Sequence, residues 1–260
     1  MQPRDIATRT QDASPLVQRV LGEGLVVAVL IVWWIVASGL PEFVLPGPVA
    51  VGRRLTELFL GGEALEHTLA SAWRVIVSVG LALVIGGGLA LVAYFVPVLE
   101  DVVHQCVRPF MNSFPSIGWA ILAAIWFEPG HFAVLFVQVA ILTPFCLINI
   151  SEGLRTLDRE ILEMGVSFTR NRRRVLGGIV LPLLMPYIVA ALRISYGIGW
   201  KISLVSELLG ATTGLGYLML RAQTTADTAT VLATCFAIVL IFIAGERLVL
   251  APLAHRFTYR

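Results

Sequence analysis

Long apolar segments alternate with short polar segments along most of this chain. A helix rises 1.5 Å per residue, so a run of roughly 20 apolar residues is long enough to cross the hydrocarbon of a bilayer. The pattern predicts an all-α integral membrane protein with about six transmembrane helices. The expected spans are residues 24–40, 69–96, 109–127, 132–150, 181–209 and 228–245.

The third of these runs differs from the others because it is interrupted and polar. It contains Asn112, Ser113, Pro115 and Ser116. Irregular backbone is tolerated in a membrane only where protein buries it or water reaches it. We therefore predict that this segment lines a cavity, with Asn112 and Ser116 as candidate residues of a translocation pathway. The alternative is that these side chains only satisfy a proline kink.

The segments between the apolar runs are polar and are expected to lie outside the hydrocarbon. Glycine and proline mark their turns. An amphipathic helix is expected after residues 41–48, which contain three prolines and a glycine. A polar connection is expected at 97–108, a tight turn at 128–131 and a polar loop at 210–227. A further polar loop, at 151–174, is expected to begin with a short helix around 152–160.

Composition supports the membrane assignment and limits the number of domains. Hydrophobic residues make up 57% of the chain and charged residues 14%, and the mean hydropathy is +0.85. A soluble domain carries about 25% charged residues. We predict a single transmembrane domain over 24–260, preceded by a cytoplasmic tail over 1–23 that is either loosely ordered or an interfacial helix. The net charge of +2 is too small to suggest binding to nucleic acid.

The distribution of arginines predicts the orientation of the chain in the membrane. With both termini in the cytoplasm, thirteen basic residues fall on the cytoplasmic side and only Arg53, Arg54 and Arg221 fall outside. The opposite orientation would carry an arginine cluster across the bilayer. The thirteen are Arg4, Arg9, Arg19, Arg108, Arg155, Arg159, Arg170, Arg172, Arg173, Arg174, Arg247, Arg256 and Arg260.

The fifth run holds three ionisable residues, Arg193, Lys201 and Glu207, in an otherwise apolar segment. Such groups are costly in a membrane and usually face a cavity or a partner. Lys201 either offers positive charge to an anion in the pathway or, like Glu207, pairs with another helix or subunit. Pairing is favoured for Arg193. Arg74, near the start of the second run, is expected to snorkel or to pair with Glu66.

Helical spacing assigns the polar residues of the fifth run to different faces. Ser203, Ser206 and Glu207 share one face, and Trp200 lies one turn before Ser203. Lys201 is six residues from Glu207 and lies on another face. The candidate pathway residues in this run are Trp200, Lys201, Ser203, Ser206 and Glu207.

No pattern of metal-binding or catalytic residues is present. Cys106, Cys146 and Cys235 lie far apart in or near apolar runs and are expected to be small buried hydrophobes. The four histidines lack ligand spacing, so we expect no metal site. No nucleophile, histidine and acid can be combined on one side of the membrane, so an enzyme is not expected.

A polar, basic segment over 163–182 joins the fourth and fifth runs. It resembles the cytoplasmic Glu-Ala-Ala segment of permease subunits of ATP-binding-cassette (ABC) importers, in particular the nitrate/sulfonate/taurine branch. Gly165 replaces the second Ala and Thr169 replaces a Gly, and the turn is expected to differ because Thr does not easily take a positive φ. The residues that match the motif positions are Glu163, Met164, Gly165, Thr169, Ile179, Leu181 and Pro182.

Two further segments resemble the same branch. The sequence LPGP at 45–48 is similar to the LPSP that often precedes the amphipathic helix there. Glu207 is followed by Gly214-Leu215-Gly216-Tyr217, and a Glu and a Gly-x-Gly-Tyr end this helix and form the outer loop in the branch. The resemblance therefore implies an outer loop built on Gly214, Gly216 and Tyr217.

The resemblance implies the fold of a type I ABC importer permease and a set of partners. These are a second copy of the chain, two cytoplasmic ATP-binding subunits, an extracytoplasmic solute-binding protein and the bilayer of a bacterial inner membrane. The loop over 151–181 would dock on the ATPase through a short helix at Glu163. ATP and Mg²⁺ would be bound by the ATPase, and this subunit would hold no cofactor.

The implied function is import of a small, anionic solute such as a sulfonate, nitrate or carboxylate by alternating access. A permease for a vitamin precursor or an aromatic acid is a rival within the same class. An ATP-independent transporter or channel is a second alternative, and it predicts no loss of activity on changing Glu163 to Arg. An integral-membrane enzyme is a further alternative. It would need several polar residues that converge at one membrane interface, and the sequence shows no such group.

Overall fold

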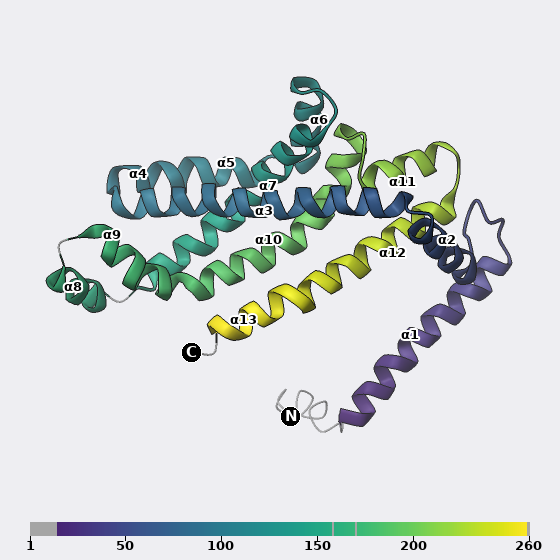
Figure 1. Cartoon of the computed structure of the whole chain (residues 1–260), viewed down its shortest axis with the longest axis horizontal. Helices are drawn as coiled ribbons and strands as arrows, with labels where there is room; N and C mark the ends of the chain where they lie inside the picture. Colours follow the sequence, from purple (N-terminus) through teal and green to yellow (C-terminus); the bar gives the residue numbers. More distant parts are fainter. Residues whose placement is uncertain (1–14, 158, 170, 259–260) are drawn as a thin grey trace, which may run out of the picture.

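The computed structural model describes residues 15–157, 159–169 and 171–258. These residues are organised in helices, and none of them forms a strand. The predictions for the first fourteen residues, for Arg170 and for Arg260 lie outside the described residues. Figure 1 shows an elongated bundle with the N-terminal helix splayed away from it.

The helices follow one another with short connections. Three five- or six-residue segments are π-helical and are labelled η. The order is α1 (Pro15–Ser38), α2 (Pro48–Leu60), α3 (Glu63–Phe95), α4 (Pro97–Asp101), η1 (Val102–Val107), α5 (Arg108–Ser113), α6 (Ser116–Trp126), α7 (His131–Arg155), α8 (Arg159–Phe168), α9 (Arg172–Val175), η2 (Leu176–Val180), α10 (Leu181–Gly210), α11 (Leu215–Thr224), α12 (Thr228–Gly245), η3 (Glu246–Leu250) and α13 (Ala251–Thr258).

Within the described residues, five helical segments are long and apolar enough to cross a membrane, and Ser116–Trp126 is a shorter apolar helix. These six segments correspond to the six predicted runs. The third run is interrupted as expected, because Phe114 has an extended backbone before Pro115 and separates α5 from α6. A residue that precedes proline disfavours the helical conformation. The five long segments are Leu21–Ser38, Ala64–Phe95, His131–Arg155, Leu176–Gly210 and Thr228–Arg256.

Three sequence predictions about connections were wrong. Residues 97–108 are helical, because Pro97 starts a helix that continues through η1 into α5. The loop over 210–227 contains α11. The short helix expected around 152–160 begins only at Arg159, because α7 continues to Arg155. The first helix begins at Pro15, so residues 15–23 of the predicted tail are helical, which is one of the two forms expected for it.

Helices α3, α7 and α10 pack against one another and form the centre of the bundle. A Cβ added at Gly86 would lie 2.6 Å from the Thr143 carbonyl oxygen, so glycine allows α3 and α7 to approach closely. Gly87 likewise faces Ile150, whereas Gly80 and Gly88 face open space. Close packing on α7 therefore depends on two of the four glycines within α3.

The two ends of the bundle carry different elements. Figure 1 shows α8 and α9 at one end and α2 and α11 at the opposite end. Helix α1 contacts the rest mainly near its last turns, where the Trp33 indole nitrogen donates to the Pro46 carbonyl oxygen at 3.1 Å and the Trp33 ring stacks on Phe236. Most of its apolar surface is exposed.

The cysteines differ in burial. Cys146 is buried beside the Ser195 hydroxyl, Cys235 is half-buried, and Cys106 is exposed. The expectation of a buried thiol was therefore wrong for Cys106, which lies in the helical segment that had been predicted as a connection.

Candidate functional site

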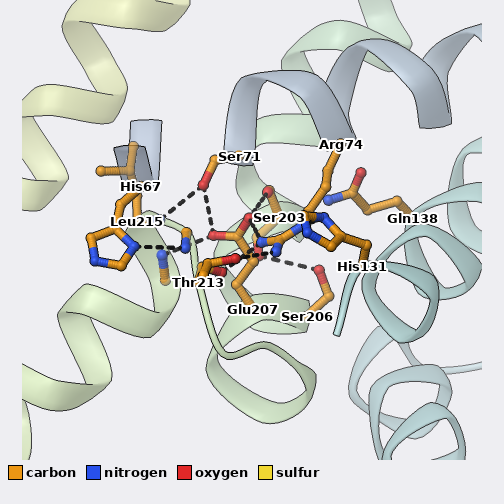
Figure 2. Close-up of polar contacts among 12 residues, drawn as sticks. His67, Ser71, Arg74, His131, Gln138, Ser203, Ser206, Glu207, Thr213 and Leu215 are labelled. Atoms are coloured by element: carbon orange, nitrogen blue, oxygen red, sulfur yellow. Dashed lines mark hydrogen bonds and ion pairs between the residues drawn. The ribbon is translucent and has the colours of Figure 1, made fainter. Parts of the chain in front are cut away.

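A buried ion pair joins α3 to α10 near the α11 end of the bundle. The guanidinium of Arg74 lies 2.8 Å from the carboxylate of Glu207, and the side chains are 0% and 1% exposed. Two charges removed from water are costly unless their geometry is good and their remaining hydrogen-bonding groups are satisfied. Figure 2 shows polar side chains converging on the pair from several elements.

Arg74 uses its other donors on α7 and on the segment before α11. Its Nη1 and Nη2 groups donate to the carbonyl and the hydroxyl of Thr213 at 2.6 and 2.7 Å. Its Nε donates to Nδ1 of His131 at 3.1 Å. The predicted pairing with Glu66 was wrong, because two helical turns separate the residues along α3 and Glu66 is exposed.

Glu207 is satisfied by three donors in addition to Arg74. The Ser71 hydroxyl donates to Oε2 at 2.8 Å, the Gly216 amide donates to the same oxygen at 2.9 Å, and the Ser203 hydroxyl donates to Oε1 at 3.3 Å. The Gly216 amide belongs to the first turn of α11. The carboxylate therefore also stabilises the positive end of that helix dipole.

The start of α11 is held by side chains of α3. The Gly214 amide donates to Nδ1 of His67 at 3.0 Å, and the Leu215 amide donates to the Ser71 hydroxyl at 2.8 Å. Gly214 has φ +115°, and a Cβ there would lie 2.5 Å from the Glu207 carboxylate. Glycine is therefore needed at 214 both for the backbone conformation and for the close approach.

The Arg74–Glu207 network, defined here as His67, Ser71, Arg74, His131, Ser203, Glu207 and residues 213–216, fastens four elements together at one end of the bundle. Sequence analysis identified Glu207 and the Gly-x-Gly segment. It missed Ser71, Thr213 and the role of both histidines. One signal in the sequence could have indicated the network. Arg74 lies in the second apolar run and Glu207 in the fifth, these two runs cross the membrane in opposite directions, and two ionisable residues of opposite charge in apolar runs are expected to pair.

The predicted pathway residues do not form one cluster. Ser203, Ser206 and Glu207 share a face, as the spacing predicts, and this face is buried. Lys201 lies on another face beside a cavity that α12 also lines. Trp200 is buried and lines the same cavity. Their assignment to a pathway stays a prediction, as does that of Asn112 and Ser116, which are exposed on the interrupted third span.

Arg193 is paired, as favoured from the sequence. Its Nε donates to Oε1 of Glu246 at 2.9 Å, and its Nη2 contacts the same oxygen. Arg193 therefore links α10 to η3 and is not an isolated charge in the span.

The Glu163 segment forms a helix at the end of the bundle opposite the network. Glu163 and Met164 are exposed on α8, and Phe168 is 85% exposed. Gly165 is buried, and a Cβ there would overlap Cδ1 of Ile179. Gly165 and Ile179, which belong to the first and last parts of the sequence motif, are thus in contact across the loop.

Thr169 directly follows α8, and its φ is not positive. In the described part of the chain, Ala226 is the one non-glycine residue with a positive φ. The amide of Thr169 donates to the Gly165 carbonyl at 3.3 Å, and its hydroxyl accepts from the Asn171 amide at 3.3 Å. Leu181 and Pro182 are exposed at the start of α10. Among the described residues no group of three His, Cys, Asp or Glu side chains could hold a metal ion.

Comparison with known sequences places the chain in a protein family. Residues 78–251 match the family described as "Binding-protein-dependent transport system inner membrane component". The chain is 27% identical over 253 residues to the taurine transport system permease protein of Escherichia coli, covering 94% of this chain and 91% of that protein. It is 28% identical over 251 residues to the riboflavin transport system permease protein of Chloroflexus aurantiacus, covering 92% and 90%.

Comparison with solved structures supports the fold. A chain of the methionine ABC transporter, described as inward facing, superposes with a TM-score of 0.60 at 16% identity. The match covers 75% of this chain and 97% of that chain. This similarity shows the fold of a type I importer permease, as the resemblance at the Glu163 segment implied.

Proposed function

The chain belongs to the family of binding-protein-dependent transport system inner membrane components, and from this membership we propose that two copies of it form the transmembrane pathway of an importer. As an ABC importer permease it is a pathway subunit and not an enzyme. The nucleotide and Mg²⁺ bind to two partner ATPase subunits, and a solute-binding protein delivers the solute on the other side of the membrane.

The observation that carries this proposal is the exposed surface of α8. Met164 and Phe168 are one helical turn apart and both are exposed, at 54% and 85%. Gly165, on an adjacent part of the α8 surface, is seated on the chain against Ile179. A short helix with apolar residues outward and a glycine inward is suited to docking in a groove of a partner. Movement of the partner would then act on α10 through η2.

The orientation follows from the arginine distribution. We propose that the α8 end faces the cytoplasm and that the α2 and α11 end faces outward, with both termini inside. The Arg74–Glu207 network then lies near the outer end of the pathway, where it fastens the outer loop at Gly214, Gly216 and Tyr217.

The solute that this arrangement favours is a small organic anion. Lys201 supplies positive charge within a span, and the relative of E. coli is named for taurine, which carries a sulfonate. Similarity to a riboflavin permease supports a second candidate, a larger aromatic solute such as a vitamin or its precursor. The binding protein would supply most of the discrimination between them.

The proposal is tested on the intact transporter purified from its host. Mass spectrometry of the purified complex should identify an ATPase and a binding protein, and liposomes containing the complex should import radiolabelled taurine or an alkanesulfonate only with ATP and the binding protein. Import by this chain alone, without either partner, would contradict the proposal and favour an ATP-independent transporter.

Orientation is tested separately by labelling cysteines. In a Cys106→Ser background, Ser167→Cys on α8 should react with a membrane-impermeant maleimide only in inside-out vesicles. Leu60→Cys, exposed at the opposite end, should react only in right-side-out vesicles. Labelling of residue 167 from outside would overturn the orientation.

A further inference from the structure

A cavity of about 310 Å³ lies where the end of α1 meets the start of α2. It is lined by Trp34 and Ser38 in the last two turns of α1, by Glu42 in the connection that follows, and by Arg53 in the second turn of α2. Figure 1 shows α2 at the end of the bundle that also carries α11. The cavity therefore presents one anionic and one cationic side chain.

The position of the cavity along α1 places it at the level of the lipid headgroups. The apolar span of α1 ends at Ser38, so the residues that follow lie where hydrocarbon gives way to polar groups. Trp34 supports this level, because it is 63% exposed and tryptophan side chains concentrate at the membrane interface. The placement depends only on where the span ends and not on which side of the membrane is cytoplasmic.

The two charged side chains of the cavity are not paired with each other. Glu42 and Arg53 are exposed, and neither makes a side-chain hydrogen bond or an ion pair within the part of the chain that the structure describes. The next residue is used differently, because Arg54 donates to Thr230 and lies 3.5 Å from the Asp227 carboxylate. Arg54 thus holds α2 on α12, whereas Arg53 and Glu42 suit a ligand that carries both charges.

An apolar stripe of α1 continues from the cavity into the span. Leu30 and Val27 precede Trp34 by four and seven residues, so the three side chains share one face of the helix. Leu30 is 45% exposed and Val27 is 53% exposed. Trp33 lies on another face, where it stacks on Phe236. A ligand whose polar part occupies the cavity has this stripe of α1 as a surface for an acyl chain.

We propose that this cavity binds the headgroup of a zwitterionic phospholipid, and that phosphatidylethanolamine fits it best. The phosphate accepts from the Arg53 guanidinium, and the primary ammonium donates to the Glu42 carboxylate. A volume of about 310 Å³ is at the lower end of the range for ligand pockets, which suits a headgroup and leaves the acyl chains outside, along Trp34 and Leu30. Phosphatidylglycerol would satisfy Arg53 but would offer Glu42 no cation.

The first test measures which lipid the protein keeps. The complete transporter is placed in nanodiscs that contain equal amounts of phosphatidylethanolamine and phosphatidylglycerol. Native mass spectrometry then counts the phospholipids that remain bound when the complex is released. The unaltered chain should retain phosphatidylethanolamine in preference to phosphatidylglycerol.

Substitutions at the two charges give the second test. Exposed ion pairs contribute little each, so we expect changes of about threefold. Glu42→Gln should lower the ratio of retained phosphatidylethanolamine to phosphatidylglycerol by about that factor, because only the ammonium loses its partner. Arg53→Gln should lower the retention of both lipids, because both carry the phosphate. Arg54→Gln and Glu66→Gln are the matched controls, since neither residue lines the cavity, and both should leave the ratio unchanged.

Other outcomes would overturn the inference. Equal retention of the two lipids by the unaltered chain, or an unchanged ratio in Glu42→Gln, would show that the cavity does not select a zwitterion. If lipid retention were the same in every variant but Arg53→Gln lost the solute-binding protein, the cavity would be a contact with that protein. The proposal requires only that the chain lies in a membrane, so its failure is distinct from failure of the importer proposal.

Discussion

Arg74 and Glu207 are 133 residues apart in the sequence, and their charged groups lie 2.8 Å apart in the interior of the bundle. Each charge is surrounded by further hydrogen-bonding groups from α3, α7, α10 and the segment before α11. The pair thus determines how α3 and α10 lie against each other and where α11 begins. Its strength can be measured by removing its members one at a time.

Removing one charge of the pair should destabilise the protein strongly. Arg74→Met and Glu207→Gln each leave a buried group without its partner, which costs about 3–5 kcal/mol. We expect a matching decrease in the free energy of unfolding of the purified chain in detergent. The double variant should lose less than the sum of the two single variants. A strictly additive double variant would show that the two side chains do not interact.

Ser71 and Ser206 are both buried serines near the pair, and they should behave differently. The Ser71 hydroxyl donates to Glu207 and accepts from the Leu215 amide. Ser71→Ala leaves that amide without its acceptor and removes one of the donors to the Glu207 carboxylate, so it should cost about 1–3 kcal/mol. The Ser206 hydroxyl bonds only to carbonyls of its own helix. Ser206→Ala should therefore change the unfolding free energy by much less. Equal losses would argue against the network.

Gly214 and Gly62 allow backbone strain to be separated from crowding. Both have positive φ, at +115° and +80°, but only Gly214 has neighbours within reach of an added Cβ. Gly62→Ala should show the strain of a left-handed residue alone, about 1–2 kcal/mol. Gly214→Ala should cost more because its Cβ also displaces the Glu207 carboxylate. The two midpoints of thermal unfolding compare these losses directly, and a larger loss at Gly62 would contradict the geometry.

The exposed apolar residues of α8 should be needed for association with the ATPase. Phe168→Asp and Met164→Asp place a charge in the proposed contact without filling any space in the chain itself. Both variants should reduce co-purification of the ATPase and solute-stimulated ATP hydrolysis while thermal unfolding of the permease stays unchanged. Leu60→Asp is the control, because Leu60 is 89% exposed on α2 at the other end of the bundle. If only the Leu60→Asp control lost the ATPase, the ATPase would bind at the α2 end of the bundle and not at α8.

Asp227 should make the stability depend on acidic pH. Its carboxylate caps α12 by accepting from the amide and hydroxyl of Thr230, and Arg54 lies 3.5 Å away. Burial alone raises the pKa of Asp227, but the bonds from Thr230 and the charge of Arg54 together lower the pKa below its usual value of 3.8.

Because the folded pKa of Asp227 is the lower one, its contribution is complete above the unfolded value near 3.8 and is lost as the pH falls through the folded pKa. The midpoint of thermal unfolding should decrease over that acidic range. Asp227→Asn can still cap the helix but does not titrate, so its midpoint should depend less on pH there. An unchanged pH dependence in this variant would exclude Asp227 as the source.

The sequence determined where the long apolar helices lie because the bilayer imposes a simple rule on composition. Runs of about 20 apolar residues must form spans, and all six expected runs correspond to helical segments. The interruption before Pro115 was also predictable, because the backbone before a proline is restricted locally. The short helix at Glu163 was predictable as well, because the residues of its motif are close in sequence.

The tertiary structure alone decided how the polar residues of the spans are used. Spacing along α10 separates Glu207 from Lys201, but it does not reveal that Arg74 pairs with Glu207 while Lys201 has no partner in the described chain. Helix α11 was missed for the same reason, since donors and acceptors on α3 and α10 fix its first turn. Charge pairing depends on distances in space between helices, and those distances are set by packing that no local pattern in the sequence records.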